Sequence, residues 1–246
     1  MEDDTLLRYS RQIMLPDVGV EGQQRIIDST VLIMGVGGLG SPVALYLAAA
    51  GVGHLILCDF DTVELSNLQR QIIHGTPDIG KLKTESAQDA LETINPSIKV
   101  TTVTEQLTAN TILPWVNQAD LVLEGTDNFE SRFITNQACV DTHTPFISAA
   151  VSRFEGQLMA FENTKDSACL RCVFPELPEE AQTCSENGIL APVAGLMGSL
   201  QATQALKILV GLDPQYQTLM LLDAKIMDLR KLKLRKDQNC PACQQG

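Results

Sequence analysis

Short apolar runs alternate with longer amphipathic stretches over the first 150 residues of the chain. The apolar runs are "VLIMG", "HLILCD", "KVTTVTE", "ADLVLEGTD" and "PFISAAV", and between them lie "SPVALYLAAAG", "KLKTESAQDALETI" and "SRFITNQACVD", which have helical patterns. Apolar strands separated by helices are typical of βαβ units whose parallel sheet is covered on both faces. The pattern therefore predicts a Rossmann-like, doubly wound α/β fold with a mostly parallel sheet over residues 29–150.

The rest of the chain has the pattern of a mixed or antiparallel half. "EGQLMAFE" alternates like a strand with one exposed face, and "TLMLLDA" and "DLRKLKLR" predict two more strands. Residues 1–28, rich in arginine and glutamine, predict an N-terminal helical arm. Because no internal repeat or low-complexity linker divides the chain, we expect a single domain over residues 1–246, composed of the arm, the doubly wound half (29–150) and the mixed half (151–246).

One segment, residues 188–206, has no charged side chain and comes close to the length of a membrane-spanning helix. It contains Pro192 and Gln201, together with other polar residues. Such groups are costly in lipid. We therefore expect a helix that is buried in the protein or at an interface. A loop-rich, acidic segment precedes it, over residues 163–187.

Composition indicates an acidic globular protein. Apolar residues make up 44% of the chain, which supports a core and argues against disorder. The formal net charge of −12 argues against a basic groove for nucleic acid, and the basic cluster "LRKLKLRK" has the period of a solvated strand edge. The N-terminal "MEDDTLLRYSRQ" lacks the regions of a signal peptide. With seven cysteines and no export signal, we expect a reducing, cytoplasmic location.

A glycine-rich turn, "GVGGLG", joins the first predicted strand to the first helix of the doubly wound half. Gly35, Gly37 and Gly40 allow a tight turn and a close approach of the backbone to phosphate at a helix N-terminus. Asp59 ends the next strand, where it can accept a hydrogen bond from a ribose hydroxyl. These features predict a bound adenosine phosphate, and they fit a nicotinamide cofactor as well as any other nucleotide.

Residues beyond the second strand favour a nucleoside triphosphate. "DFDTVELSNLQRQ" places Arg70 just after the ribose-binding strand, and Lys83 follows. Such cations stabilise the charge on a departing pyrophosphate. A nicotinamide cofactor has only two phosphates, which the glycine turn already binds, so it would not need these additional cations. Asp127 ends another strand and could hold Mg²⁺. The alternative is that Arg70 and Lys83 are surface charges and that Asp127 is a helix N-cap.

Several motifs occur in the order that is found in a known family. "RYSRQ", "GVGGLG", "DFDTVELSNLQRQ", "TDN", "CLRC", "GSLQA" and "CPAC" together resemble the ThiF/MoeB/HesA family over essentially the whole chain. These proteins are bacterial relatives of ubiquitin-activating enzymes. The resemblance implies a homodimer that uses ATP and Mg²⁺ to adenylylate the C-terminal glycine of a small ubiquitin-like sulfur carrier protein ending in Gly-Gly. One departure is Gly125, where family members often have cysteine.

The resemblance also implies roles for individual residues. The expected nucleotide-binding residues are Gly35, Gly37, Gly38, Gly40, Asp59, Ser66, Asn67, Leu68, Gln69, Arg70, Lys83, Asp127 and Asn128. The expected catalytic residues are Arg11, Arg70, Lys83, Asp127 and Cys184. Arg11 resembles the family arginine that reaches into the active site of the neighbouring subunit, but by its sequence it could equally be a surface residue on a mobile arm. The three histidines show no nucleophile or ligand spacing and are interpreted as structural.

Two Cys-x-x-Cys pairs, Cys169 with Cys172 and Cys240 with Cys243, suit a closed tetrahedral zinc site. Redox activity is the alternative, but the thioredoxin context is missing. The family resemblance implies a structural zinc at these positions.

The remaining cysteines differ in their setting. Cys184 lies in the acidic stretch "PEEAQTCSENG" and matches the family cysteine that is proposed to take part in covalent sulfur or carrier transfer. A nonessential loop cysteine is the alternative. Cys58 and Cys139 fall in apolar patterns and are interpreted as inert core residues.

The leading hypothesis is an adenylyltransferase that acts on a ThiS-like carrier, for thiamine thiazole synthesis, or on a MoaD-like carrier, for molybdopterin synthesis. Since no rhodanese-like extension is present, we expect a separate sulfur donor. The alternatives are a nicotinamide-dependent oxidoreductase, a non-catalytic zinc-stapled scaffold for sulfur relay, and a tRNA-modifying relative that adenylylates a small carboxylate. No nucleic acid or membrane partner is expected.

Overall fold

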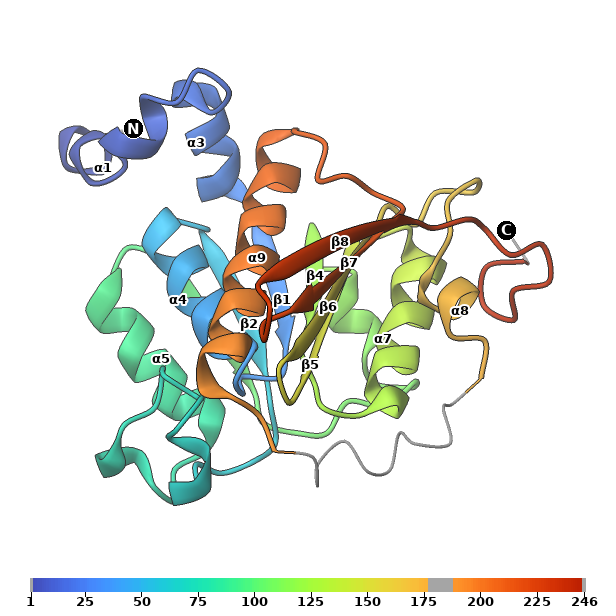
Figure 1. Ribbon diagram of the computed structural model, residues 1–246. Coiled ribbons are helices and arrows are strands. Elements are labelled where there is room, and N and C mark those ends of the chain that lie inside the picture. The colour runs from blue at the N-terminus through green and yellow to red at the C-terminus, as the bar shows by residue number, and fades with distance from the viewer. Residues whose placement is uncertain (1, 177–187, 245–246) are drawn as a thin grey trace.

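An eight-stranded sheet runs through the computed structural model, which describes residues 2–176 and 188–244 (Figure 1). The strands are β1 (Thr30–Met34), β2 (His54–Cys58), β3 (Lys99–Val103), β4 (Leu121–Glu124), β5 (Phe146–Ser152), β6 (Glu155–Phe161), β7 (Thr218–Asp223) and β8 (Asp228–Lys233). Their spatial order is β3-β2-β1-β4-β5-β6-β7-β8. The pairings are parallel from β3 to β5 and antiparallel from β5 to β8. The predicted parallel half followed by an antiparallel half is therefore confirmed.

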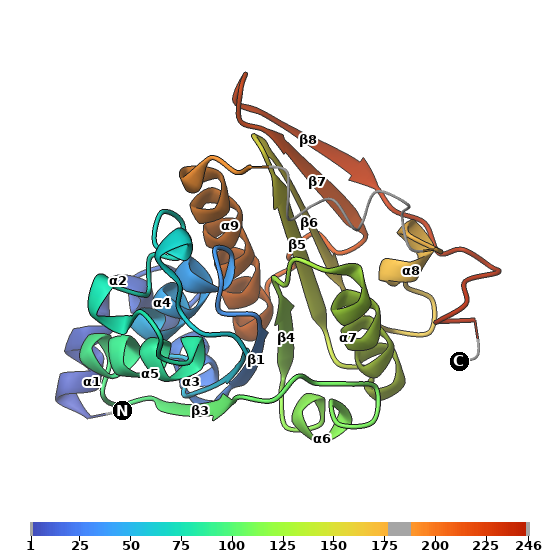
Figure 2. The ribbon, with the colours of Figure 1, turned by 90° about the horizontal axis from the view of Figure 1, so that it is seen from below.

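Helices cover both faces of this sheet (Figure 2). The helices are α1 (Asp3–Arg8), α2 (Ser10–Ile13), α3 (Gly19–Asp28), α4 (Gly40–Ala50), α5 (Lys83–Ile94), α6 (Leu113–Val116), α7 (Phe129–Thr142), α8 (Leu170–Val173) and α9 (Ala191–Val210), with short 3₁₀ helices η1 (Leu65–Asn67) and η2 (Thr76–Asp78). In β1, Val31 and Ile33 pack on the α4 and α9 side, whereas Leu32 and Met34 pack on the α6 and α7 side. Burial on both faces explains why this strand reads as an unbroken apolar run.

The register brings three strand ends together. Met34 at the end of β1 pairs with Cys58 of β2 on one side and with Glu124 of β4 on the other. The loops that leave β1, β2 and β4 consequently start from one edge of the sheet, which is where open α/β sheets bind ligands.

The uncharged segment forms α9, which packs on α4 and against the sheet. By length and composition it is apolar enough to cross a membrane, but more than half of its most apolar stretch is buried inside the protein. Its buried Gln201 also has partners within the fold, since Gln201 Nε2 donates to the carbonyls of Glu124 at 2.9 Å and Ile147 at 3.0 Å. The expectation of a buried helix is confirmed.

Strand β6 differs from the sequence expectation of one exposed face. Only its first half keeps that pattern, because Glu155 is exposed while Leu158 to Phe161 are buried. Phe161 stacks on Phe146 of β5 in the core on the α7 side, and Leu158 packs in the core on the α9 side. A central strand is buried on both faces wherever helices pack over it. The alternation of apolar and polar residues within the strand does not show where those helices lie. The edge strand β8, in contrast, is exposed along most of its length, as its basic pattern predicted.

The N-terminal arm is helical, as expected, and is held against α4 and α5. Tyr9 is 4% exposed, and its hydroxyl accepts a hydrogen bond from Asn95 Nδ2 at 2.9 Å. Gln12 and Gln23 both donate to the carbonyl of Ala50 at the end of α4, at 3.1 and 3.0 Å. These contacts fix α2, and they leave the neighbouring Arg11 side chain exposed.

Candidate active site

A cavity of about 530 Å³ lies at the carboxyl ends of β1, β2 and β4. It also extends over the antiparallel strands, where it is lined by Ala150, Gln157 and Leu221. The lining includes nine of the residues that the sequence predicted for nucleotide binding, namely Gly35, Gly37, Gly38, Asp59, Gln69, Arg70, Lys83, Asp127 and Asn128. The tertiary structure thus brings together residues that lie as far as 93 positions apart, from 35 to 128.

The glycine turn is held from both sides. Val36 N donates to Asp59 Oδ2 at 2.8 Å, and Val36 O accepts from His74 Nε2 at 3.1 Å. A carbonyl oxygen only accepts, so His74 Nε2 carries a proton, and Nδ1 lies 2.8 Å from the Ser86 hydroxyl. Burial lowers the pKa of His74, which favours the neutral ring. Gly35 has a φ of +86°, which favours glycine. The turn therefore presents the N-terminus of α4 to the cavity in a fixed geometry, and such a terminus attracts anions.

Gly40 and Gly37 are predicted to respond differently to alanine. A Cβ at Gly40 would lie 2.0 Å from the carbonyl oxygen of Gly35, whereas the nearest atom to a Cβ at Gly37 is Gln71 Nε2 at 3.5 Å. We expect Gly40→Ala to lower the free energy of unfolding by about 1–3 kcal/mol in a denaturant titration. Gly37→Ala should keep the stability of the parent and weaken nucleotide binding, because its methyl group points into the cavity. Equal stability losses in the two variants would contradict this geometry.

Asp59 supports the turn as well as lining the cavity. Besides its bond to Val36, its Oδ1 accepts from Asp61 N at 3.0 Å. Burial raises the pKa of the Asp59 carboxyl, and the nearby Lys83 ammonium opposes that shift. Each carboxylate oxygen has a further lone pair, so Asp59 can still accept a bond from a ligand hydroxyl.

Lys83 is a buried cation at the start of α5. Its side chain is 8% exposed and its Nζ lies 2.7 Å from Asp61 Oδ2, while Asp61 itself is 54% exposed. Asp61 was not predicted from the sequence, although the repeated aspartate in "DFD" was a signal for it. Because Asp61 can be hydrated when it loses this partner, Lys83 can exchange it for a phosphate at modest cost. Arg70, the second cation, donates from Nη1 to the carbonyl of Ser66 at 3.2 Å.

Asp127 is an exposed carboxylate at the cavity and does not cap α7. The N-cap is Asn128, whose side chain accepts from Ser131 N at 2.8 Å. The interpretation of Asp127 as a cap is therefore wrong. Among the described residues, no hydrogen bond or ion pair involves its carboxylate. A free carboxylate beside a phosphate site fits the ligand set that Mg²⁺ prefers.

A buried network that the sequence analysis missed supports this loop. Glu124 is fully buried; its carboxylate accepts from Thr126 N at 2.7 Å and from the Ser148 hydroxyl at 2.9 Å. Arg132 Nε lies 3.4 Å from Glu124, and its Nη2 donates to the carbonyl of Thr126 at 2.6 Å. Burial raises the pKa of Glu124, whereas Arg132 and the hydrogen-bond donors oppose the shift. The network fixes both ends of the turn that carries Asp127.

Some predicted residues do not line the cavity. Gly40 is packed against Gly35, Ser66 donates to Glu64 at 3.2 Å, and Leu68 is also absent from the lining. Asn67 instead lines a neighbouring pocket of about 160 Å³, together with Lys83.

One expected catalytic residue, Arg11, does not line the cavity of this chain. Arg11 is exposed on the N-terminal arm. Cys184 lies outside the described residues.

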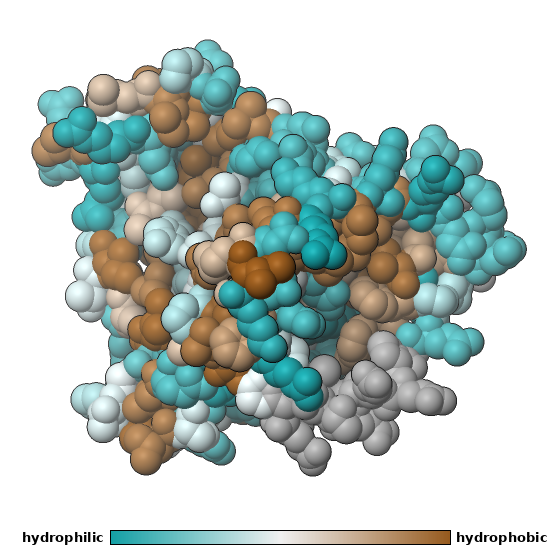
Figure 3. Space-filling view, in the orientation of Figure 1, coloured by the Kyte–Doolittle hydropathy of each residue, from teal (hydrophilic) through white to brown (hydrophobic). Residues whose placement is uncertain are grey.

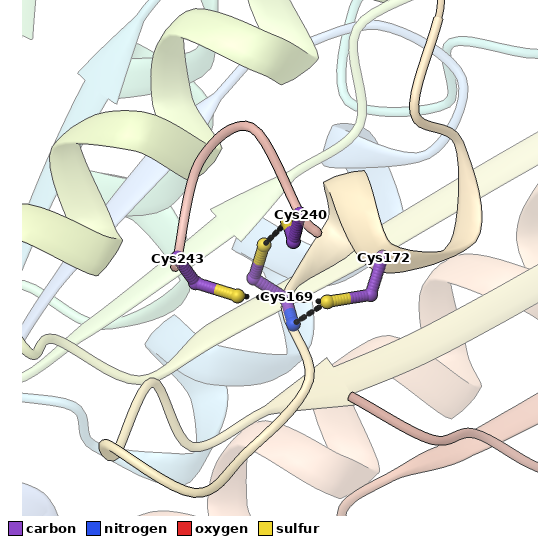
Figure 4. Close-up of side chains that lie close together, drawn as sticks. All are labelled: Cys169, Cys172, Cys240 and Cys243. Carbon is purple, nitrogen blue, oxygen red and sulfur yellow. Dashed lines mark hydrogen bonds between the residues drawn. The ribbon is translucent and has the colours of Figure 1, made fainter. Parts of the chain in front are cut away.

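The four predicted zinc ligands form one cluster (Figure 4). Cys169 Sγ lies 3.6 Å from Cys240 Sγ, Cys172 Sγ lies 3.5 Å from Cys243 Sγ, and all four sulfurs are within 4.8 Å of one another. A tetrahedral zinc with Zn–S bonds of about 2.3 Å sets its sulfurs about 3.8 Å apart, whereas a disulfide needs about 2.05 Å. The cluster therefore fits a structural zinc.

Asn136 of α7 supports the cluster and was missed by the sequence analysis. This buried amide donates from Nδ2 to Cys169 Sγ at 3.7 Å and accepts at Oδ1 from Leu170 N at 2.9 Å. Bonds of this kind orient the sulfur ligands of a metal.

Cys58 and Cys139 behave as the sequence predicted. Both are buried, and burial raises the pKa of Cys58 to about 12 and that of Cys139 still further. Cys58 lines the cavity, but a thiol with so high a pKa is a poor nucleophile near neutral pH.

The chain is similar to several known proteins. A family model described as the ThiF family matches residues 9–242. The chain is 45% identical to the sulfur carrier protein ThiS adenylyltransferase of Escherichia coli K12, over 99% of this chain and 97% of that protein. It is 43% identical to the molybdopterin-synthase adenylyltransferase of the same strain, over 100% and 99% of the two chains. A crystal structure of E. coli MccB with ATP superposes with a TM-score of 0.84 at 25% identity, covering 96% of this chain and 74% of that one.

Proposed function

The chain belongs to the ThiF family, and we infer that it is an adenylyltransferase that uses ATP to activate the C-terminal carboxylate of a sulfur carrier protein. The observation that carries this inference is the shape of one cavity. One end of the cavity is lined by the glycine turn, Arg70 and Lys83. The other end extends over β5 to β7, where Ala150 and Leu221 line it. The first end suits a triphosphate, and the second leaves room for the extended tail of a carrier protein.

The reaction requires positioning and charge stabilisation. A carrier carboxylate is ionised at neutral pH, so no general base is needed. One of its oxygens forms a bond to the α-phosphorus of ATP, and the bond from that phosphorus to the bridging oxygen breaks, which releases pyrophosphate and leaves the carrier adenylate. The amides of the glycine turn hold the phosphates, and Lys83 and Arg70 stabilise the charge that develops on pyrophosphate.

The remaining roles are part of the same proposal. Asp127 would hold Mg²⁺, which supplies positive charge to the phosphate oxygens. Asp59 accepts from the ribose, and Ser66, Asn67, Leu68 and Gln69 belong to the same nucleotide site. Cys184 takes part in a later covalent transfer step, and a separate protein donates the sulfur. We place the enzyme in the cytoplasm.

We further propose a homodimer in which Arg11 of each chain reaches the cavity of the other. Leu7, Met14 and Leu15 on the same arm are 74%, 70% and 54% exposed. Figure 3 shows apolar surface on this arm, at the upper left of the view. Exposed apolar side chains that gather in this way are typical of an interface.

ATP–pyrophosphate exchange tests the proposed function. The assay is run separately with a ThiS-like and a MoaD-like carrier, each with an intact Gly-Gly terminus, in the presence of Mg²⁺. Exchange with one carrier identifies the substrate, and exchange with both indicates a shared activator. Exchange with neither would refute the adenylyltransferase proposal, and a parallel titration with NAD distinguishes the oxidoreductase alternative.

A further inference from the structure

The side chain of Gln71 faces the glycine turn from within the cavity. Gln71 is 4% exposed and is one of the lining residues. Its Nε2 lies 3.5 Å from the position that a Cβ on Gly37 would take. The absence of a side chain at Gly37 therefore leaves open the space between this amide and the turn.

The carbonyl oxygen of this amide has no partner. Gln71 Oε1 is buried and accepts no hydrogen bond from the described residues. A buried polar atom without a partner is destabilising, and such atoms are rare in folded proteins. A phosphate oxygen cannot satisfy this acceptor. The Nε2 group of the same amide, which faces Gly37, has no hydrogen-bond partner among the described residues either, and it is available to donate to a ligand in the cavity.

The backbone of Gln71 is anchored to the turn that it faces. Gln71 N donates to the carbonyl of Asn67 at 3.0 Å, and Gln71 O accepts from His74 N at 3.1 Å. The His74 ring in turn binds the carbonyl of Val36 at 3.1 Å. Gln71 and the glycine turn are therefore joined by one short chain of bonds, which keeps the amide at a fixed place beside the turn.

We propose that Gln71 is a further nucleotide-binding residue, whose Nε2 donates a hydrogen bond to a non-bridging phosphate oxygen held at Gly37 and Gly38. The inference rests on the proposed function, which supplies ATP as the ligand. A phosphate oxygen only accepts, and Nε2 is the atom of this amide that lies nearest to Gly37, so its NH₂ group can donate to the ligand. Unlike Arg70 and Lys83, this group adds a directional bond without adding charge, so it orients the phosphate chain.

Gln71→Met tests the proposal, with Gln204→Met as the matched control. Gln204 is also a buried glutamine, 8% exposed, with an unpartnered Oε1, but it does not line the cavity. A hydrogen bond to a charged group of this kind corresponds to a change of about 10- to 100-fold in binding. We expect Gln71→Met to weaken ATP binding by that factor in a calorimetric titration, and to leave adenosine binding, measured by ligand NMR, within about twofold.

The outcomes separate this proposal from the proposed function. If the parent chain does not bind ATP, the proposed function fails. If the parent binds ATP and Gln71→Met binds it equally well, or loses adenosine binding by the same factor, the phosphate contact is refuted. Gln204→Met should bind ATP as the parent does, and a matching loss there would point to a general packing effect. Should Gln71→Met not fold, Gln71→Asn keeps an amide but withdraws it by one methylene, and the same loss of ATP binding is expected.

Discussion

Asp127→Ala is expected to lower ATP–pyrophosphate exchange by about 1,000-fold while the protein stays folded. The ion that we assign to Asp127 supplies several kcal/mol of stabilisation to the reacting phosphates, and each 1.36 kcal/mol corresponds to a tenfold change in rate. The fold should be unaffected, because the Asp127 side chain is exposed and α7 is capped by Asn128. Exchange rates, together with thermal unfolding of the same sample, measure both effects.

Two further variants make this result specific. Asp127→Asn keeps the size of the side chain and removes its charge, so it should lose nearly as much activity as Asp127→Ala, and raising the Mg²⁺ concentration should recover part of it. Asp166→Ala removes an exposed aspartate that does not line the cavity, and it should retain the exchange rate of the parent. Retained exchange in Asp127→Ala would refute the assignment of Asp127 to Mg²⁺.

Loss of one cysteine from the sulfur cluster is expected to have the largest effect on stability. Cys240→Ser removes a sulfur that lies 3.6 Å from Cys169 Sγ, and these residues are 71 positions apart in the sequence. Because the free energy of binding a structural zinc is about 10–16 kcal/mol in small peptides and contributes directly to folding, losing one ligand should cost several kcal/mol. For a chain of this size, that corresponds to a fall of about 10 °C in Tm. Thermal unfolding and the zinc content per chain, by mass spectrometry, are the measurements.

Cys139→Ser is the matched control for this prediction. Cys139 is also a buried cysteine, but it lies outside the cluster. Its replacement should lower stability only because it places a polar hydroxyl group in the core, and the protein should still bind one zinc per chain. A parent protein that contains no zinc, and whose Tm does not change with a chelator, would contradict the zinc assignment.

Much of the fold follows from periodicity within single elements. The apolar runs at β1, β2 and β4 predicted buried parallel strands because side chains on both faces of such strands must avoid water. Strand β6 is the exception. The second half of β6 is buried on both faces, and this cover comes from elements distant in the sequence, so the alternation of β6 alone could not reveal it.

The residues of the candidate site that could be predicted are those that can be recognised from their position in the sequence next to a strand. The glycine turn and Asp59 directly follow strands, Asp127 lies in the turn just after β4, and the carboxyl ends of parallel strands meet at one edge. The residues that were missed are of a different kind. Asp61 and Glu124 matter because of the partners that their side chains meet.

The sequence alone therefore determined the order of the main strands and helices, the glycine turn and the two Cys-x-x-Cys pairs, because these depend on residue spacing along the chain. Only the tertiary structure decided that Asn128 caps α7 and leaves Asp127 free, that Lys83 pairs with Asp61, and that two cysteine pairs meet across 71 positions. Side-chain partners are selected by packing between distant segments. The free energy of that packing depends on three-dimensional contacts, which no short pattern of residues encodes.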